Sequence, residues 1–259
     1  MKTAPDQLPQ DSSEKTALHP PAELVNLVGG DFASVGAEFL GYLKTLSRLR
    51  PEHAVLDIGS GCGRLAAPLS SYLGPGGRYE GIEIHAESVR WCRENIHSQS
   101  APFRFQTADI FNGFYNPQGS VAARDYRFPF EEGTFDRVLF VSVFTHMLPE
   151  DVTRYLSEAH RVLKKGGEIL ATFFLINPES WKTIQAREHE FPYEKAQGGY
   201  YFCNSKIHED VTAYDETWVR ETLRQIGFQN GPKVFYGRWT RRADALSFQD
   251  LLLTGKTDS

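Results

Sequence analysis

The chain has 259 residues, of which 41% are hydrophobic and 24% charged, and its formal net charge is -5. These values are typical of a globular chain that is long enough to bury its own core as one decorated domain. They argue against binding to a phosphate backbone, because neutralising many phosphates requires a basic surface. We therefore expect a small-molecule partner and no nucleic acid.

Membrane, export and metal signals are weak. The longest uncharged run, residues 110–123, has 14 residues, whereas a membrane-spanning helix needs roughly 20. Residues 1–20 are polar and carry neither the apolar stretch of a secretory signal nor the arginine-rich pattern of a transit peptide. The 3 cysteines show no metal-binding or disulfide spacing. We expect a cytoplasmic protein with no membrane span and no metal site, in which residues 1–20 form a disordered tail and 21–259 one domain.

Periodicity predicts alternating helices and strands. Apolar residues at helical spacing indicate a helix from Ser34 to Leu46, with Asp31 or Ser34 as its cap. Beyond it we expect strands at 54–58, 78–84, 103–106, 135–143 and 168–174, alternating with helices at 64–73, 86–96 and 149–163. This alternation favours an α/β fold with a parallel sheet that is covered by helices on both faces.

The pattern changes after residue 176. Residues 177–215 are polar and aromatic, and we predict that they form a lid or partial cap. Their rings are suited to enclosing an organic molecule, or alternatively they form the core of a small cap: Trp181, Phe191, Tyr193, Tyr200, Tyr201, Phe202 and Tyr214. A helix at 216–226 and strands at 233–236 and 246–254 complete the predicted fold.

The turn after the first strand carries three glycines, in the sequence VLDIGSGCGR at 55–64. Glycine allows backbone conformations that other residues avoid and lets the backbone approach a ligand. The G-x-G-x-G spacing differs from the G-x-G-x-x-G of dinucleotide-binding proteins, and Asp57 would repel a pyrophosphate. These features favour a cationic or zwitterionic ligand and disfavour a nicotinamide oxidoreductase.

Two further carboxylates follow the next strands. Glu83 lies 26 residues after Asp57 at the end of the second strand, where it could accept hydrogen bonds from both hydroxyls of a ribose. Asp109 follows the third strand and could meet an adenine amine, with Ile84 and Ile110 as apolar walls for the ring. Carboxyl ends of parallel strands meet at one edge of a sheet, so we expect these groups to share one site.

These motifs resemble those of the class I S-adenosylmethionine-dependent methyltransferases. VLDIGSGCGR is similar to the glycine motif, EGIEI to the ribose motif, TADI to the adenine motif and FDRVLFVSVFTHM to the fourth-strand motif, while HRVLKKGG is a typical entry into the fifth strand. The resemblance implies a doubly wound, mostly parallel, seven-stranded Rossmann-like sheet that ends in an antiparallel strand, and S-adenosylmethionine as cofactor. It implies cofactor contacts at Asp57, Gly59, Ser60, Gly61, Gly63, Glu83, Ile84, Asp109, Ile110 and Ser142.

The residues after the fourth strand bear on the acceptor. Members that methylate exocyclic amines of DNA bases or protein amides carry Asn or Asp followed by Pro-Pro and an aromatic residue there, but this chain has VSVFTH at 141–146. His146 is a candidate general base, or else it only hydrogen-bonds the start of the next helix. Tyr115, in an 18-residue insert at 110–127 that either shapes the acceptor pocket or is a passive surface loop, is a second candidate.

The sequence therefore predicts methyl transfer to a hydroxyl oxygen of a small natural product, sugar or lipid-like acceptor. N-methylation of a small amine is the first alternative, and binding of S-adenosylmethionine without catalysis is the second. The basic residues Arg238, Arg241 and Arg242 either contact an anionic acceptor or form a solvated turn. The acceptor's identity and the oligomeric state are left open.

Overall fold

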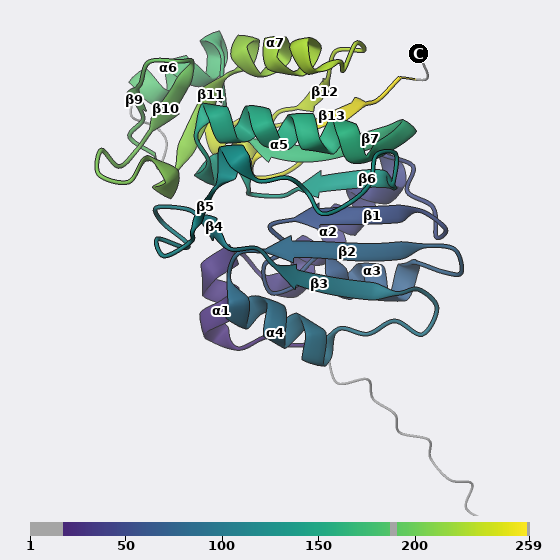
Figure 1. Cartoon of the computed structure of the whole chain (residues 1–259). Coiled ribbons are helices and arrows are strands. Elements are labelled where there is room, and N and C mark those ends of the chain that lie inside the picture. Colours follow the sequence, from purple (N-terminus) through teal and green to yellow (C-terminus); the bar gives the residue numbers. More distant parts are fainter. Residues whose placement is uncertain (1–17, 187–190, 258–259) are drawn as a thin grey trace, which may run out of the picture.

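A computed structural model describes residues 18–186 and 191–257, so residues 1–17 of the expected tail lie outside the described residues. The main sheet has seven strands: β1 Ala54–Ile58, β2 Arg78–Glu83, β3 Phe103–Thr107, β6 Phe135–Phe140, β7 Leu163–Phe173, β12 Lys233–Phe235 and β13 Asp250–Gly255. Their order is β12-β13-β7-β6-β1-β2-β3 (Figure 1). Neighbours from β7 to β3 are parallel, and β13 is antiparallel to both β7 and β12. The predicted seven-stranded, doubly wound sheet is confirmed.

Helices cover both faces of this sheet (Figure 1). On one face α2 Phe32–Thr45, α3 Ala66–Tyr72 and α4 Ala86–Asn95 pack against the side of β1 that carries Val55. On the other face α5 Pro149–Val162 and α7 Glu216–Ile226 pack against the side that carries Leu56. Every residue of β1 is buried as a result, which explains why four of its five residues are apolar.

The N-terminal part of the described chain adds one short helix. The carboxylate of Asp31 accepts a hydrogen bond from the backbone nitrogen of Ser34 at 2.8 Å and caps α2, so Asp31 is the cap. Before it, α1 Ala22–Val28 buries Leu24 in a cluster with Phe32 and Cys62. Since Cys62 belongs to the glycine turn, this packing places α1 beside that turn.

Three predicted strand bounds differ from the structure by more than one residue. The strand expected at 135–143 ends at Phe140, because Ser142 has a φ of 59° and the chain turns into the 3-10 helix η2 Phe144–His146. The strand expected at 168–174 begins at Leu163, which pairs with Phe135 ahead of an irregularity in the register. The last strand begins at Asp250 and not at residue 246.

The region predicted as a lid contains a second, four-stranded sheet in the order β8-β11-β10-β9. Its elements are β8 Leu175–Ile176, α6 Pro178–Gln185, β9 Glu194–Lys195, β10 Tyr200–Phe202, the 3-10 helix η3 His208–Asp210 and β11 Thr212–Asp215. Many of its rings lie in a core of their own, with Tyr193 and Tyr201 buried beside Trp239. This packing fits the second interpretation of the aromatic stretch, a small core, while the role of a lid stays a prediction.

The carboxyl ends of β1, β2 and β6 meet at one edge of the main sheet, on the left in Figure 1. The insert after β3 lies at this edge and forms β4 Ile110–Phe111, β5 Val121–Ala122 and the 3-10 helix η1 Ala123–Asp125. Another 3-10 helix, η4 Arg238–Thr240, precedes β13. Because the chain runs from β1 toward β3 and then returns to β6, this edge is the switch point where doubly wound folds bind ligands.

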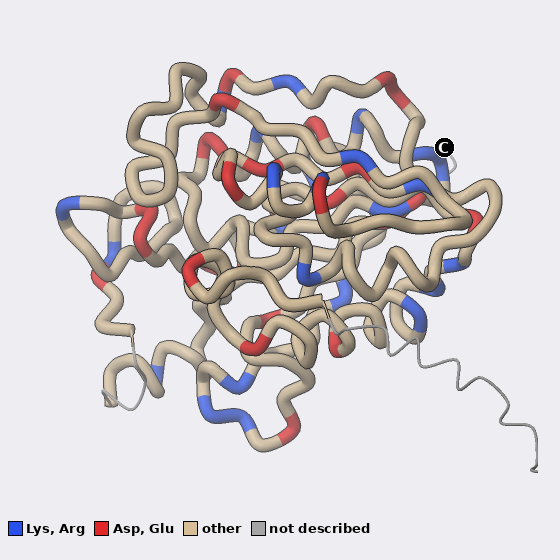
Figure 2. Tube along the Cα trace, turned by 90° about the horizontal axis from the view of Figure 1, so that it is seen from below, with Lys and Arg blue, Asp and Glu red and all other residues tan. Residues whose placement is uncertain are grey.

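Figure 2 shows Lys and Arg interspersed with Asp and Glu along much of the trace. Across residues 18–186 and 191–257, no helix combines the length and apolar composition that a membrane crossing requires. The expected absence of a nucleic-acid partner and of a metal stays a prediction.

Candidate functional site

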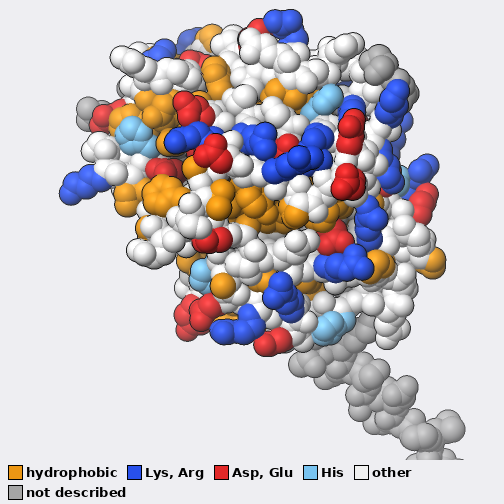
Figure 3. Space-filling model, in the orientation of Figure 1, with side chains coloured by type: hydrophobic (Ala, Val, Ile, Leu, Met, Phe, Trp, Pro, Cys, Tyr) orange, Lys and Arg blue, Asp and Glu red, His pale blue; other side chains and the backbone are white. Residues whose placement is uncertain are grey.

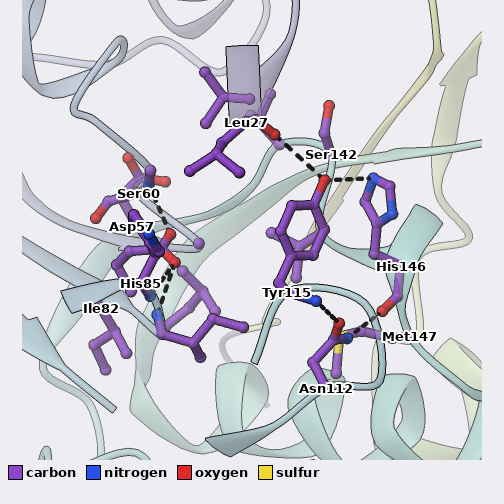
Figure 4. Close-up of a pocket in the computed structure, with 18 of the residues that line it drawn as sticks. Leu27, Asp57, Ser60, Ile82, His85, Asn112, Tyr115, Ser142, His146 and Met147 are labelled. Atoms are coloured by element: carbon purple, nitrogen blue, oxygen red, sulfur yellow. Dashed lines mark hydrogen bonds between the residues drawn. The ribbon is translucent and has the colours of Figure 1, made fainter. Parts of the chain in front are cut away.

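A cavity of about 560 Å³ opens at the switch point. The glycine turn, the end of β2, the insert and the stretch after β6 all contribute to its wall (Figure 4). Ten of the twelve predicted site residues line it, and the two that do not are Gly63 and Asp109. The structure thus brings together side chains from segments that are widely separated in the sequence.

The glycine turn needs its glycines for two reasons. Gly59, Gly61 and Gly63 have φ angles of 71°, 54° and 83°, in the left-handed region that other residues rarely adopt. A Cβ atom at Gly59 or Gly61 would also lie 2.6 Å from a methyl group of Val143 or Val28, respectively. The turn therefore presents bare backbone to the cavity. Gly63 serves packing, because a Cβ there would lie 2.2 Å from Ile96.

Glu83 lies at the cavity wall and is held by three backbone amides. One carboxylate oxygen accepts from the amides of Ile84 and His85 at 2.7 and 2.8 Å, and the other accepts from Gly61 at 2.8 Å. Backbone N–H groups thus fix the carboxylate at the tip of β2 and tie it to the glycine turn. Such a carboxylate can still accept further hydrogen bonds from a ligand.

Asp57 is buried at the end of β1 and also lines the cavity. The Tyr79 hydroxyl donates to its carboxylate at 2.6 Å. Burial raises the pKa of Asp57 to about 7, and the nearby Glu83 carboxylate acts in the same direction, while Tyr79 and Arg64 oppose the rise. A cation in the cavity would favour the ionised form of this group.

Arg64 is a site residue that the sequence analysis missed. Its guanidinium is buried and donates to the carbonyl oxygens of Val28 and Gly29 at 3.1 and 3.0 Å. It lines the cavity, and burial lowers its pKa. The available signal was its position directly after the third glycine of the turn. No sequence signal indicated that the loop after α1 would join this wall.

Two of the three predicted adenine contacts line the cavity, and the third does not. Ile84 and Ile110 both line the cavity, as apolar walls should. Asp109 is exposed and lies outside the lining, and both of its carboxylate oxygens accept hydrogen bonds from Ser120. Its contact with an adenine amine stays a prediction.

Two predicted residues follow β6. The Ser142 hydroxyl, which reaches the cavity, donates to the side-chain oxygen of Gln249 at 3.2 Å. The Nδ1 atom of His146 lies 3.1 Å from the carbonyl oxygen of Glu209. Because a carbonyl oxygen only accepts, this contact places the ring proton on Nδ1 and leaves Nε2 of the neutral ring as an acceptor. Burial lowers the pKa of His146, so the ring is neutral near pH 7.

Tyr115 extends from the insert into the middle of the cavity (Figure 4). Its hydroxyl lies 3.4 Å from Nε2 of His146 and 3.4 Å from the carbonyl oxygen of Leu27 in α1. Burial raises the pKa of Tyr115 to about 12, and the Glu83 carboxylate contributes. Tyr115 is therefore a hydrogen-bond donor near neutral pH, and His146 is the candidate with an acceptor nitrogen.

The remaining wall residues include polar groups from far along the chain. Among the described residues of the predicted lid segment, Glu209 in η3 lines the cavity. None of the described aromatic residues of that segment lines it. Arg238 lines it, whereas the Arg242 guanidinium stacks on Tyr236 at 3.9 Å and forms an ion pair with Glu179 at 3.1 Å. The basic group therefore divides into a cavity residue and a residue with a structural role.

Comparison with known proteins identifies the fold and its motifs. A sequence model of the family described as "Methyltransferase domain" matches residues 56–171. These residues run from β1 into β7 and contain Asp57, the glycine turn, Glu83 and His146. The resemblance to the class I S-adenosylmethionine-dependent methyltransferases is thus confirmed over these residues.

Curated methyltransferases share moderate identity with this one. It is 27% identical over 188 residues to arsenite methyltransferase of Aquipseudomonas alcaligenes. This alignment covers 73% of this chain but only 51% of the relative. It is 26% identical to the ubiquinone/menaquinone biosynthesis C-methyltransferase UbiE of Cupriavidus pinatubonensis, with coverage of 85% of this chain and 84% of the relative. This methyltransferase thus spans about half the length of the arsenite enzyme.

A solved structure shares the fold at low identity. The 1,6-didemethyltoxoflavin-N1-methyltransferase of Burkholderia thailandensis, solved with 1,6-didemethyltoxoflavin and S-adenosylhomocysteine, has a TM-score of 0.52 and 19% identity, covering 88% of this chain and 80% of that one. At this identity the likeness concerns the fold alone.

The cofactor of this family, S-adenosylmethionine, fits the groups that the cavity offers. The glycine turn presents backbone where side chains would clash, and Asp57 and Glu83 place negative charge beside it. The buried Ser60 hydroxyl in this turn has no hydrogen-bond partner among the described residues. These groups at the tips of β1 and β2 have the chemistry that a cationic nucleoside requires.

Proposed function

We propose that this methyltransferase transfers the methyl group of S-adenosylmethionine to a hydroxyl oxygen of a small organic acceptor, with His146 as general base. The observation that carries the proposal is the geometry of the imidazole. Its Nδ1 is engaged by the Glu209 carbonyl at 3.1 Å, and its Nε2 lies 3.4 Å from the hydroxyl of Tyr115, which also lines the cavity. An alcohol or phenol must lose its proton during attack, and Nε2 is placed to take it.

The cofactor half of the cavity is defined by Asp57, the glycine turn 59–63, Arg64 and Glu83. We propose that Glu83 accepts hydrogen bonds from ribose hydroxyls, and that Asp57 stabilises the positive charge of the methionine portion. Arg64 carries the opposite charge and suits the carboxylate of the same portion. S-adenosylmethionine, when bound, supplies a methyl group on a positively charged sulfur.

The acceptor half is defined by Tyr115, His146, Glu209, Arg238 and Gln249. Here the chain has to align the incoming oxygen with the methyl group and keep water away. The lowered pKa of His146 keeps Nε2 unprotonated near neutral pH, so the base is ready before the acceptor arrives. Tyr115 can donate a hydrogen bond to the acceptor oxygen and so hold it next to Nε2.

The names of the similar proteins span arsenite, carbon and nitrogen chemistry, so they do not decide the acceptor atom. N-methylation is the second candidate, because an amine with a neutral lone pair needs no base. It predicts that His146 is dispensable for the chemical step. Cofactor binding without turnover predicts no product with any acceptor.

The test supplies S-adenosylmethionine with a deuterated methyl group and compares phenols, alcohols and amines as acceptors. Mass spectrometry detects the labelled product, and NMR assigns the atom that carries the methyl group. We expect an O-methyl product. Labelled product from amines alone, or no product while calorimetry shows cofactor binding, would overturn the oxygen assignment.

A further inference from the structure

Exposed apolar side chains gather at the cavity mouth. Among the described residues, six large hydrophobic side chains are exposed by more than a third: Leu27 39%, Phe111 46%, Phe114 47%, Val121 37%, Leu246 40% and Phe248 38%. Single exposed apolar residues are common on protein surfaces, whereas a cluster of them marks a binding surface. We name these six residues the apolar rim.

Each member of the apolar rim is tied to the cavity. Leu27, Phe111 and Phe248 line it directly. The Phe114 ring lies 4.8 Å from that of Tyr115 and 6.3 Å from that of His146, measured between ring centroids. The other two are adjacent to lining residues, because Val121 pairs with Ile110 in the β4–β5 sheet and Leu246 precedes Ser247.

The rim has two sides. The insert and α1 supply Leu27, Phe111, Phe114 and Val121, and the segment before β13 supplies Leu246 and Phe248. Figure 3 shows hydrophobic side chains gathered over the region of β4 and β5. A ligand that reaches His146 from outside would therefore pass apolar surface at the entrance.

Charged groups interrupt this surface. Arg238 stands beside Phe248, with its guanidinium carbon 5.9 Å from the ring centroid, and Arg124 and Glu209 also line the cavity. A flat hydrophobic partner would have to bury these charges at a cost. A ligand with a polar head and an apolar tail satisfies both kinds of group, since the head enters the cavity and the tail stays on the rim.

We propose that the apolar rim binds the hydrocarbon part of a free amphipathic acceptor whose polar head is methylated beside His146. This inference rests on the proposed function and narrows its acceptor class. Each rim side chain leaves more than a third of its surface exposed to water. Their burial by a ligand would remove apolar surface from water, and full burial of one methylene strengthens binding about fourfold.

The test measures binding by calorimetry in the presence of S-adenosylhomocysteine. Two probe pairs differ by four methylenes each: 4-pentylphenol against 4-methylphenol, and hexanoate against acetate. Because the rim covers only part of a probe's hydrocarbon chain, we expect the longer member of at least one pair to bind about tenfold tighter or more. The double variant Phe114→Ser/Leu246→Ser should reduce this advantage to within about threefold.

The double variant changes exposed residues that do not line the cavity, so it should fold and bind S-adenosylhomocysteine like the wild type. Val234→Ser, at a half-buried apolar position in the edge strand β12, is the control and should keep the advantage of the longer probe. Failure of the wild type to bind S-adenosylhomocysteine would contradict the proposed function instead, which separates the two hypotheses.

Three outcomes would overturn the inference. The first is an equal affinity of the wild type for long and short probes while S-adenosylhomocysteine binds. The second is an unchanged preference in the double variant. The third is that the wild type sediments with phosphatidylcholine vesicles or self-associates at rising concentration, and that the double variant does not. The rim would then bind a bilayer or a second copy of the chain.

Discussion

The two halves of the cavity are assembled over different distances along the chain. In the cofactor half, the bonds from Gly61 to Glu83 and from Tyr79 to Asp57 each join residues 22 apart, within one β-α-β unit. In the acceptor half, His146 contacts Glu209 63 residues away, and Tyr115 contacts Leu27 88 residues away. The first half is therefore built by local supersecondary structure and the second by segments that meet only in the folded protein.

This difference in assembly matches the two tasks of the cavity, which are binding a constant cofactor and recognising a particular acceptor. A β-α-β unit fixes backbone amides and carboxylates at a strand tip, which suits a cofactor that is the same in every turnover. Loops on a rigid scaffold can change without disturbing the sheet, which suits recognition of a particular acceptor. Changes in the cofactor half should therefore act on cofactor affinity, and changes in the acceptor half on the chemical step.

The largest expected effect is in the acceptor half. Replacing His146→Ala removes the Nε2 acceptor, and loss of a general base typically lowers kcat by about 10²- to 10⁴-fold. Calorimetry should show S-adenosylhomocysteine affinity nearly unchanged, because His146 is assigned to the acceptor half. Steady-state kinetics with the best oxygen acceptor measures kcat.

Tyr115→Phe is the companion variant. It removes the hydroxyl 3.4 Å from Nε2 but leaves the ring in place. Since the raised pKa keeps Tyr115 protonated, we expect a loss of kcat of no more than about tenfold from one lost hydrogen bond. An unchanged rate for His146→Ala, or an equal loss for both variants, would remove His146 as the base.

A loss smaller than that of His146→Ala is expected in the cofactor half. Glu83→Gln keeps the shape of the side chain but replaces one acceptor oxygen by an NH2 donor. This donor would face backbone amides that donate to the wild-type carboxylate, so their hydrogen bonds are lost. Hydrogen bonds to charged groups contribute about 1.5–3 kcal/mol each, so we expect S-adenosylhomocysteine affinity to fall about 10- to 100-fold. Calorimetry measures this affinity.

The exposed Glu87→Gln, on α4, is the matched control and should bind normally. Thermal unfolding of both variants checks that the fold is retained. Normal affinity in Glu83→Gln would show that the β2 carboxylate does not hold the ribose and would break the assignment of the cofactor half.

Much of the fold could be predicted from the sequence because its signals are local. The strand Ala54–Ile58 and the helix Glu216–Ile226 have their predicted bounds. The first is a short apolar run that ends in glycines, and the second is an amphipathic helix that ends at Gly227. Errors occurred where strand pairing extends a strand, as at Leu163, and where a positive φ turns the chain away, as at Ser142.

The glycine turn and the Glu83 carboxylate were predictable for the same reason, whereas the rest of the cavity wall was not. Asp109 has the expected spacing, yet Ser120 from the insert accommodates its carboxylate away from the cavity. Arg64 and Glu209 reach the wall only because α1 and η3 fold against it. No periodicity or motif in one sequence encodes such contacts between distant loops.

The smallest effect is a pH dependence that distinguishes the halves within one protein. Because burial raises the pKa of Asp57 to about 7, lowering the pH through 7 protonates it and removes the negative charge that favours a cationic ligand. Affinity for S-adenosylmethionine should therefore fall about tenfold from pH 8 to pH 6, and calorimetry at both pH values measures it. Asp57→Asn, which still accepts a hydrogen bond from Tyr79, should bind S-adenosylmethionine more weakly but with an affinity that does not depend on pH.

The fall of kcat at acidic pH should instead occur below pH 6.5, because burial lowers the pKa of His146. A flat wild-type binding profile would place the cationic portion away from Asp57, whereas a shared midpoint for affinity and kcat would mean that one group controls both halves.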